Sequence, residues 1–169
     1  MRLSHLYGGI AVALVVGGSV ADAQRVVVGS RAPEIDLPTL AGGRVKLSAL
    51  RGRPVVITFW GTYCPPCREE FPELVKAQAT HAHAGLYVLG VNGYDQEISE
   101  REVQKFVSEF SVPFTIALDK RGKARDKYLV RGLPTMLFID TGGVIRGIHR
   151  GPITRVGLDS GIANILVRQ

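Results

Sequence analysis

The sequence Trp60-Gly-Thr-Tyr-Cys64-Pro-Pro-Cys67-Arg-Glu-Glu70 joins the end of a predicted strand to the start of a predicted helix. Residues 54–60 form a nearly continuous β-branched and aromatic run, which is typical of a central strand covered on both faces. We expect the helix to begin around Pro65. Cys64 then lies at the helix N-terminus, where unpaired N–H groups and the helix dipole favour a thiolate. Cys67 follows one turn later, close enough to close a small disulfide.

This spacing suits reversible thiol–disulfide exchange, in which Cys64 attacks a substrate disulfide and Cys67 resolves the mixed disulfide. Only Cys64 is at the open helix end, so we expect it to be exposed and Cys67 to be buried. Pro65 and Pro66 have no N–H, so two donors that could stabilise the Cys64 thiolate are missing. Moderate thiolate stabilisation favours a reductant, because strong oxidants stabilise their reduced form.

Two structural explanations of the cysteine pair compete with exchange chemistry. A permanent disulfide that closes so short a loop would add little stability. Half of a zinc site would need two more ligands, for which the candidates are His81, His83 and His149. His81 and His83 do not share one helical face, and a solvated helix end explains them better. We therefore expect no metal.

The rest of the chain alternates predicted strands with predicted helices. Runs of apolar and β-branched residues predict strands at 34–37, 44–47, 86–92, 115–117, 136–140 and 144–150. Apolar residues at helical spacing predict helices at 65–80, 103–110, 121–128 and 158–166. Ser99-x-x-Glu102 is a capping box for the second helix, and Thr154 is the predicted N-cap of the last. This alternation implies a sheet covered by helices on both faces.

Composition and charge exclude several classes of protein. The chain has 169 residues, of which 46% are apolar, and a net charge of +6. It is too long for a disulfide-stapled miniprotein and too apolar for a disordered chain. The densest basic run, Lys120–Lys127, is diluted by Asp119 and Asp126 and has no aromatic stacking motif. We therefore expect a solvated helix face there and no nucleic-acid partner.

Residues 1–23 are predicted to be a signal peptide, because an apolar run is followed by the small-residue pattern Ala21-Asp22-Ala23. The alternative is an uncleaved membrane anchor, although the apolar stretch is just short of a comfortable span. In either case we expect the domain to be periplasmic or otherwise extracytoplasmic. No linker or repeat divides residues 24–169, which are predicted to form one domain.

The residues around the cysteines resemble the thioredoxin superfamily, and within it the TlpA/ResA/DsbE group. The motifs that carry the resemblance are Ala32-Pro33, Gly52-Arg53-Pro54, Phe59-Trp60, Arg68-Glu-Glu-Phe-Pro-Glu-Leu74, Gly132-Leu133-Pro134-Thr135 and Phe138-Ile139-Asp140-x-x-Gly143. The resemblance covers about residues 30–169. It implies an α/β, thioredoxin-like three-layer fold: a central mixed β-sheet flanked by helices, with an N-terminal β-hairpin and an αβ insertion at 93–125. It also implies an extracytoplasmic thiol–disulfide reductase, and several members of this group serve cytochrome c maturation.

The resemblance assigns further site residues. Pro134 matches the superfamily's cis-proline, which would abut the cysteines and leave the Leu133 backbone free to pair with an extended substrate. Related reductases carry a functional acid at the position of Glu70, although a solvated carboxylate like Glu69 is the alternative. Thr58 stands where thioredoxin has a proton-transferring Asp, which makes Glu70 the better candidate. The substrate-binding residues that we expect are Trp60, Tyr63, Pro65, Pro66, Leu133 and Pro134.

The expected partners follow from the same resemblance. We expect no cofactor beyond the redox-active Cys64–Cys67 disulfide, protein dithiols or disulfides as substrates, and a membrane electron donor of the DsbD/CcdA kind. We expect a monomer. One alternative function is a peroxiredoxin-like peroxidase, but Thr62 lies two residues before Cys64 and not three. The other is a copper-binding assembly factor, whose Cys-x-x-x-Cys spacing is one residue longer than the spacing here.

Overall fold

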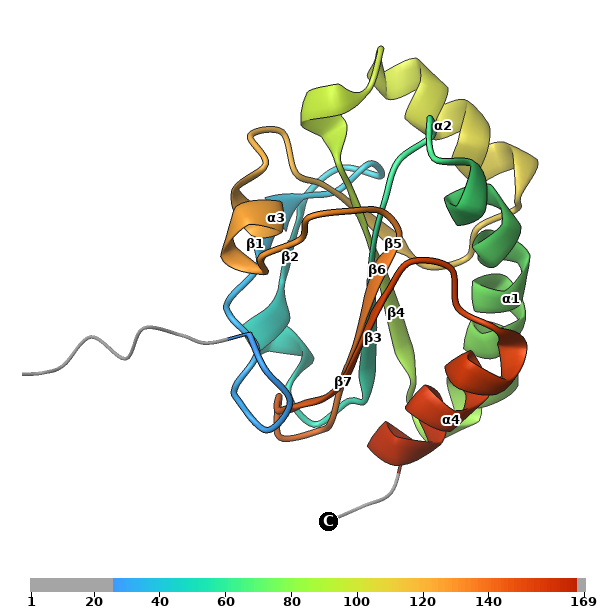
Figure 1. The fold of residues 1–169 in the computed structure, drawn as a ribbon. Coiled ribbons are helices and arrows are strands. Elements are labelled where there is room, and N and C mark those ends of the chain that lie inside the picture. Colours follow the sequence, from blue (N-terminus) through green and yellow to red (C-terminus); the bar gives the residue numbers. More distant parts are fainter. Residues whose placement is uncertain (1–25, 167–169) are drawn as a thin grey trace, which may run out of the picture.

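The computed structural model describes residues 26–166, so the predicted signal peptide lies outside the described residues (Figure 1). A five-stranded sheet lies at the centre, in the order β5-β4-β3-β6-β7. Its strands are β3 (Val55–Trp60), β4 (Tyr87–Asn92), β5 (Thr115–Leu118), β6 (Thr135–Ile139) and β7 (Ile145–Arg150). β4 runs parallel to β3 and β5, whereas β6 runs antiparallel to β3 and β7. The sheet is therefore mixed, as predicted.

Three helices cover one face of the sheet: α1 (Pro65–His81), α2 (Glu100–Glu109) and α4 (Arg155–Leu166) (Figure 1). Alternate residues of β3 contribute to the core on this side, where Val56 and Trp60 are buried. The rings of Trp60, Phe71 and Phe106 have centroids 4.6–4.8 Å apart, and they join β3 to α1 and α2. This aromatic cluster lies at the C-terminal end of β3, on the face of the sheet that α1 and α2 cover.

The opposite face is covered by a short helix and by the N-terminal hairpin. The hairpin pairs β1 (Asp36–Pro38) with β2 (Arg44–Lys46), and the 3-10 helix η1 (Leu47–Leu50) follows it. The helix on this face is α3 (Lys123–Lys127). The intervening β3 residues Ile57 and Phe59 are buried in this second core. Helices thus flank both faces as predicted, and the hairpin shares the second face with α3.

The predicted insertion contributes both a helix and a strand. After β4 the chain forms the 3-10 helix η3 (Tyr94–Gln96), then α2, and then β5, which extends the sheet beside β4. A further 3-10 turn, η2 (Ala82–Ala84), ends the α1 region. Both predicted N-caps are confirmed: the Ser99 hydroxyl accepts the Glu102 N–H at 3.3 Å, and the Thr154 hydroxyl accepts the Gly157 N–H at 3.1 Å.

Within residues 26–166, none of the helices has the length and apolar character needed to span a bilayer.

Candidate active site

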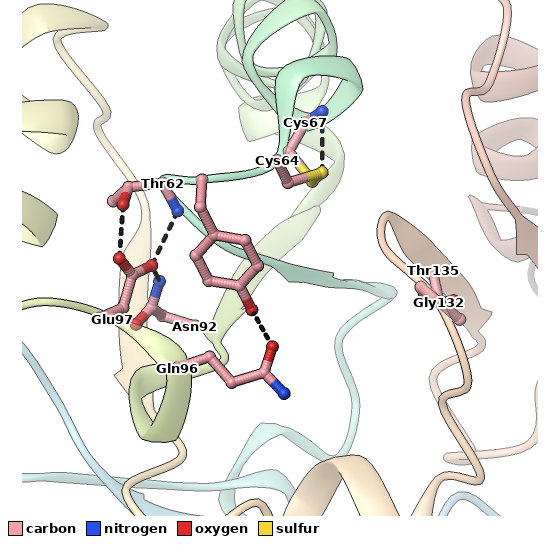
Figure 2. Close-up of a disulfide and its surroundings, with 9 residues drawn as sticks. Thr62, Cys64, Cys67, Asn92, Gln96, Glu97, Gly132 and Thr135 are labelled. Atoms are coloured by element: carbon pink, nitrogen blue, oxygen red, sulfur yellow. Dashed lines mark hydrogen bonds between the residues drawn. A yellow bond between two sulfur atoms is a disulfide. The ribbon is translucent and has the colours of Figure 1, made fainter.

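The two cysteines lie where β3 ends and α1 begins, as predicted. They form a disulfide with an S–S distance of 2.00 Å and a Cα–Cα distance of 5.3 Å. Cys64 is the N-cap of α1, and its Sγ accepts a hydrogen bond from the Cys67 N–H at 3.3 Å (Figure 2). That N–H is shared with the Cys64 carbonyl oxygen at 3.1 Å. Pro65 and Pro66 occupy the first two helical positions, so the Cys67 amide is the first N–H of the helix.

The exposure of the cysteines differs from the sequence-based expectation. Cys67 is fully buried, but Cys64 is only 6% exposed, so the prediction of an exposed Cys64 is wrong for the disulfide form. Cys64 is covered because its sulfur is bonded to Cys67 and because a later loop, residues 130–133, forms the opposite wall. Cys64 nevertheless lines a surface groove and Cys67 does not, so only Cys64 is open to attack from outside.

This surface groove, which we call the Cys64 groove, has a volume of about 420 Å³. Its lining residues come from the start of α1, from η3, from α3 and from the loop before β6: Tyr63, Cys64, Pro65, Pro66, Gln96, Arg125, Val130, Arg131, Gly132 and Leu133. Four of the six expected substrate-binding residues therefore meet around Cys64. A larger cavity, of about 540 Å³, lies between the N-terminal hairpin and β5, but no cysteine lines it.

The two remaining expected residues have other positions. The Leu133–Pro134 peptide bond is cis, as predicted, and Pro134 is buried beside Leu133. Within residues 26–166, the backbone N–H and C=O of Leu133 have no hydrogen-bond partner, which leaves them available to an extended substrate. Trp60 is fully buried and packs on Phe71 and Phe106, so the expectation that it contacts substrate is wrong. Its ring lies in the core under the site.

A carboxylate that the sequence analysis missed fixes the loop before Cys64. Glu97 accepts the Thr62 N–H at 2.7 Å, the Thr62 hydroxyl, and the Asn92 amide at 2.8 Å (Figure 2). The Tyr63 hydroxyl donates to Gln96 at 2.8 Å. A signal existed, because the loops that follow parallel neighbours such as β3 and β4 meet at one edge of the sheet.

Glu70 lies on α1 one turn beyond Cys67 and is only 5% exposed, so the alternative of a solvated carboxylate is wrong. Its Oε1 has no hydrogen-bond partner among the described residues. Burial raises the pKa of Glu70 to about 7, although a hydrogen bond from the Ile153 backbone acts in the opposite direction. A cavity of about 230 Å³ between α1 and the start of α4 adjoins Glu70, and the exposed Glu69 also lines it.

Thr58 lies on β3, on the side that α1 covers, because it alternates with Val56 and Trp60. It is fully buried, and its hydroxyl has no hydrogen-bond partner among the described residues. A hydroxyl of this kind does not titrate near neutral pH. Glu70 is therefore the buried acid on α1 nearest in sequence to the disulfide.

No group of three or more His, Cys, Asp and Glu side chains within residues 26–166 is arranged to hold a metal ion. His149, one of the candidate ligands, instead has its Nε2 2.9 Å from the Pro152 carbonyl oxygen.

Comparisons with known proteins agree with this geometry. Residues 28–148 match the AhpC/TSA family. The chain is 39% identical over 127 residues to the thioredoxin-like protein YneN of Bacillus subtilis, covering 75% of this chain and 74% of that protein. It is 36% identical over 134 residues to the thiol-disulfide oxidoreductase ResA of Halalkalibacterium halodurans, covering 79% and 74%. A crystal structure of a thiol:disulfide interchange protein assigned as DsbE, from Chlorobium tepidum, superimposes with a TM-score of 0.77 at 32% identity, covering 83% and 99%.

Proposed function

Since the chain belongs to the AhpC/TSA family and is a thiol-disulfide oxidoreductase, we propose that it reduces protein disulfides outside the cytoplasm. The observation that carries this proposal is the position of the Cys64–Cys67 disulfide at the start of α1. Cys64 alone opens onto a groove, so one sulfur can meet a substrate while the other stays inside.

The proposed cycle starts from the reduced enzyme. The Cys64 thiolate attacks one sulfur of a substrate disulfide, the substrate S–S bond breaks, and the other substrate sulfur leaves as a thiolate. Cys67 then loses its proton and attacks the Cys64 sulfur, which releases the second substrate thiol. Two electrons have passed to the substrate and the enzyme disulfide has formed. A dithiol donor must reduce this disulfide again, and we propose a membrane protein of the DsbD/CcdA kind.

The missing amides at the start of α1 support the reducing direction. Pro65 and Pro66 remove two amides from the start of α1, which leaves the Cys67 N–H as the donor to the Cys64 sulfur. A less stable thiolate makes the reduced form a better electron donor.

We assign Glu70 the transfer of the Cys67 proton. Cys67 is fully buried and must release a proton before it resolves the mixed disulfide. Glu70 lies one turn along the same helix, and its pKa of about 7 allows it to take up and release a proton near neutral pH. Replacement by Gln should therefore slow turnover and flatten the pH–rate profile near pH 7, whereas Glu69→Gln should change neither.

The cellular role is proposed from the N-terminus and from the resemblance to the TlpA/ResA/DsbE group. Residues 1–23 have the pattern of an export signal, which supports a periplasmic or other extracytoplasmic location. We propose that the protein works as a monomer in cytochrome c maturation, where apocytochrome thiol pairs must be kept reduced.

Insulin reduction, together with equilibration in glutathione redox buffers, tests the proposed function. The wild type should catalyse insulin reduction by a dithiol, Cys64→Ser should abolish it, and Cys67→Ser should accumulate a mixed disulfide. The enzyme disulfide should resist reduction by glutathione. Ready reduction by glutathione would contradict the reducing direction, and preferential alkylation of Cys67 in the reduced protein would contradict the order of attack.

The same protein samples separate the two alternative functions. A thiol-dependent consumption of hydrogen peroxide that survives Cys67→Ser would indicate a peroxidase. Tight copper binding by the reduced protein would indicate an assembly factor.

A further inference from the structure

The charged residues of the Cys64 groove are all of one sign. Two arginines, Arg125 and Arg131, line the groove, and no carboxylate does. The remaining lining residues are apolar or neutral, and they include the apolar side chains of Pro65, Pro66 and Leu133. The whole chain also carries a net charge of +6. A segment that enters this groove therefore meets positive charge without a compensating acid in the lining.

The two arginines are not equivalent. Arg125 forms an ion pair with Asp95, with 2.9 Å between its Nη2 and the Oδ2 of Asp95, and both side chains are largely covered. Its charge is therefore already balanced. Arg131 is exposed, and within residues 26–166 it has no hydrogen bond and no ion pair. Arg131 is the lining residue whose charge remains free for a ligand.

The charge of Arg131 lies close to the backbone that a substrate strand would pair with. Arg131 lies two residues before Leu133, whose unpaired backbone groups are available to an extended segment. Two residues span at most about 7 Å of extended chain. A substrate strand that pairs with Leu133 and presents its cysteine to Cys64 would then bring a side chain within about two positions of that cysteine to Arg131.

We propose that the Cys64 groove selects protein segments that carry Asp or Glu within two residues of the reacting cysteine, and that Arg131 recognises this acidic side chain. The inference rests on the proposed reductase function and adds a substrate class to it. The pair between Arg131 and the substrate acid forms at an exposed rim, so a preference of about threefold to tenfold in kcat/KM is expected. The preference should shrink at high salt.

Three disulfide-containing peptides test the proposal, identical except for Glu, Gln or Lys on both sides of the cysteine. The fully reduced wild type should reduce the Glu peptide fastest and the Lys peptide slowest at low ionic strength, with the difference largely lost at high salt. Arg131→Glu should invert this order.

The matched control is Arg31→Glu, which makes the same change in net charge. Arg31 is exposed, and its backbone forms an isolated β-bridge with Val144 at the end of the sheet opposite Cys64. This variant should therefore keep the wild-type order. Equal rates for the Glu and Lys peptides with the wild type would overturn the proposal. So would an unchanged order in Arg131→Glu, or an equal effect of Arg31→Glu. Failure to reduce any of the three peptides would instead contradict the reductase function, and the inference with it.

Discussion

Replacing Glu70 by Gln should make the fold more stable above neutral pH. Burial raises the pKa of this carboxyl from 4.5 to about 7 in the folded protein. The shift is 7 − 4.5 = 2.5 units, which corresponds to about 3 kcal/mol at 1.36 kcal/mol per unit. Because the folded state holds this proton more tightly, the free energy of unfolding falls as pH rises from 4.5 to about 7 and then levels off. Gln does not titrate, so the variant should lack this fall.

Urea unfolding of the disulfide form at a series of pH values between about 4 and 8 measures the effect. The difference between Glu70→Gln and the wild type should grow by about 3 kcal/mol over this range. Glu69→Gln, which changes the exposed neighbour on α1, should follow the wild type throughout. Parallel curves for wild type and Glu70→Gln would refute the reasoning, because they would mean that burial does not favour the protonated acid.

Three further substitutions test the hydrogen bonding of the site and the packing of the core. Glu97→Ala should lower the free energy of unfolding by about 2–3 kcal/mol in urea, because it leaves the Thr62 N–H without its acceptor; an unchanged midpoint would contradict this role. Thr58→Val should raise stability by about 1 kcal/mol and leave insulin reduction unchanged, because it removes a buried hydroxyl without a partner. A slower rate would show that Thr58 takes part in catalysis. Gly161→Ala should lower the melting temperature, because the added Cβ would lie 2.3 Å from the Phe138 ring. That overpacking costs about 1–3 kcal/mol, against about 1 kcal/mol gained in helix propensity.

The sequence predicts the fold well because its local signals are strong. The run at 54–60 predicts β3 because strands buried on both faces need apolar, β-branched residues along their whole length. The capping groups of α2 and α4 are local as well, since Ser99 and Thr154 each act on an amide three residues later. Such features depend on neighbours in the chain, and a single sequence displays them.

The site is predicted less completely, because its walls come from distant parts of the chain. Glu97 binds Thr62 across the edge of the sheet, and no local pattern links the two. The cover over Cys64 comes from residues 130–133, so the open helix end alone overstates its exposure. Trp60 is expected at the substrate surface because it is close to the cysteines in sequence. The alternation of side chains along β3 instead points its ring into the core.

The cap of α1 has a consequence for observing the enzyme at work. The Cys64 sulfur, the atom that exchanges disulfide partners, accepts the Cys67 N–H at 3.3 Å. The preceding prolines make this N–H the first of the helix. Each change at the sulfur, from disulfide to thiolate to mixed disulfide, therefore alters the hydrogen bond of one backbone proton. In a ¹⁵N-labelled sample, the chemical shift and solvent exchange of the Cys67 amide would follow the redox state continuously, without an attached probe.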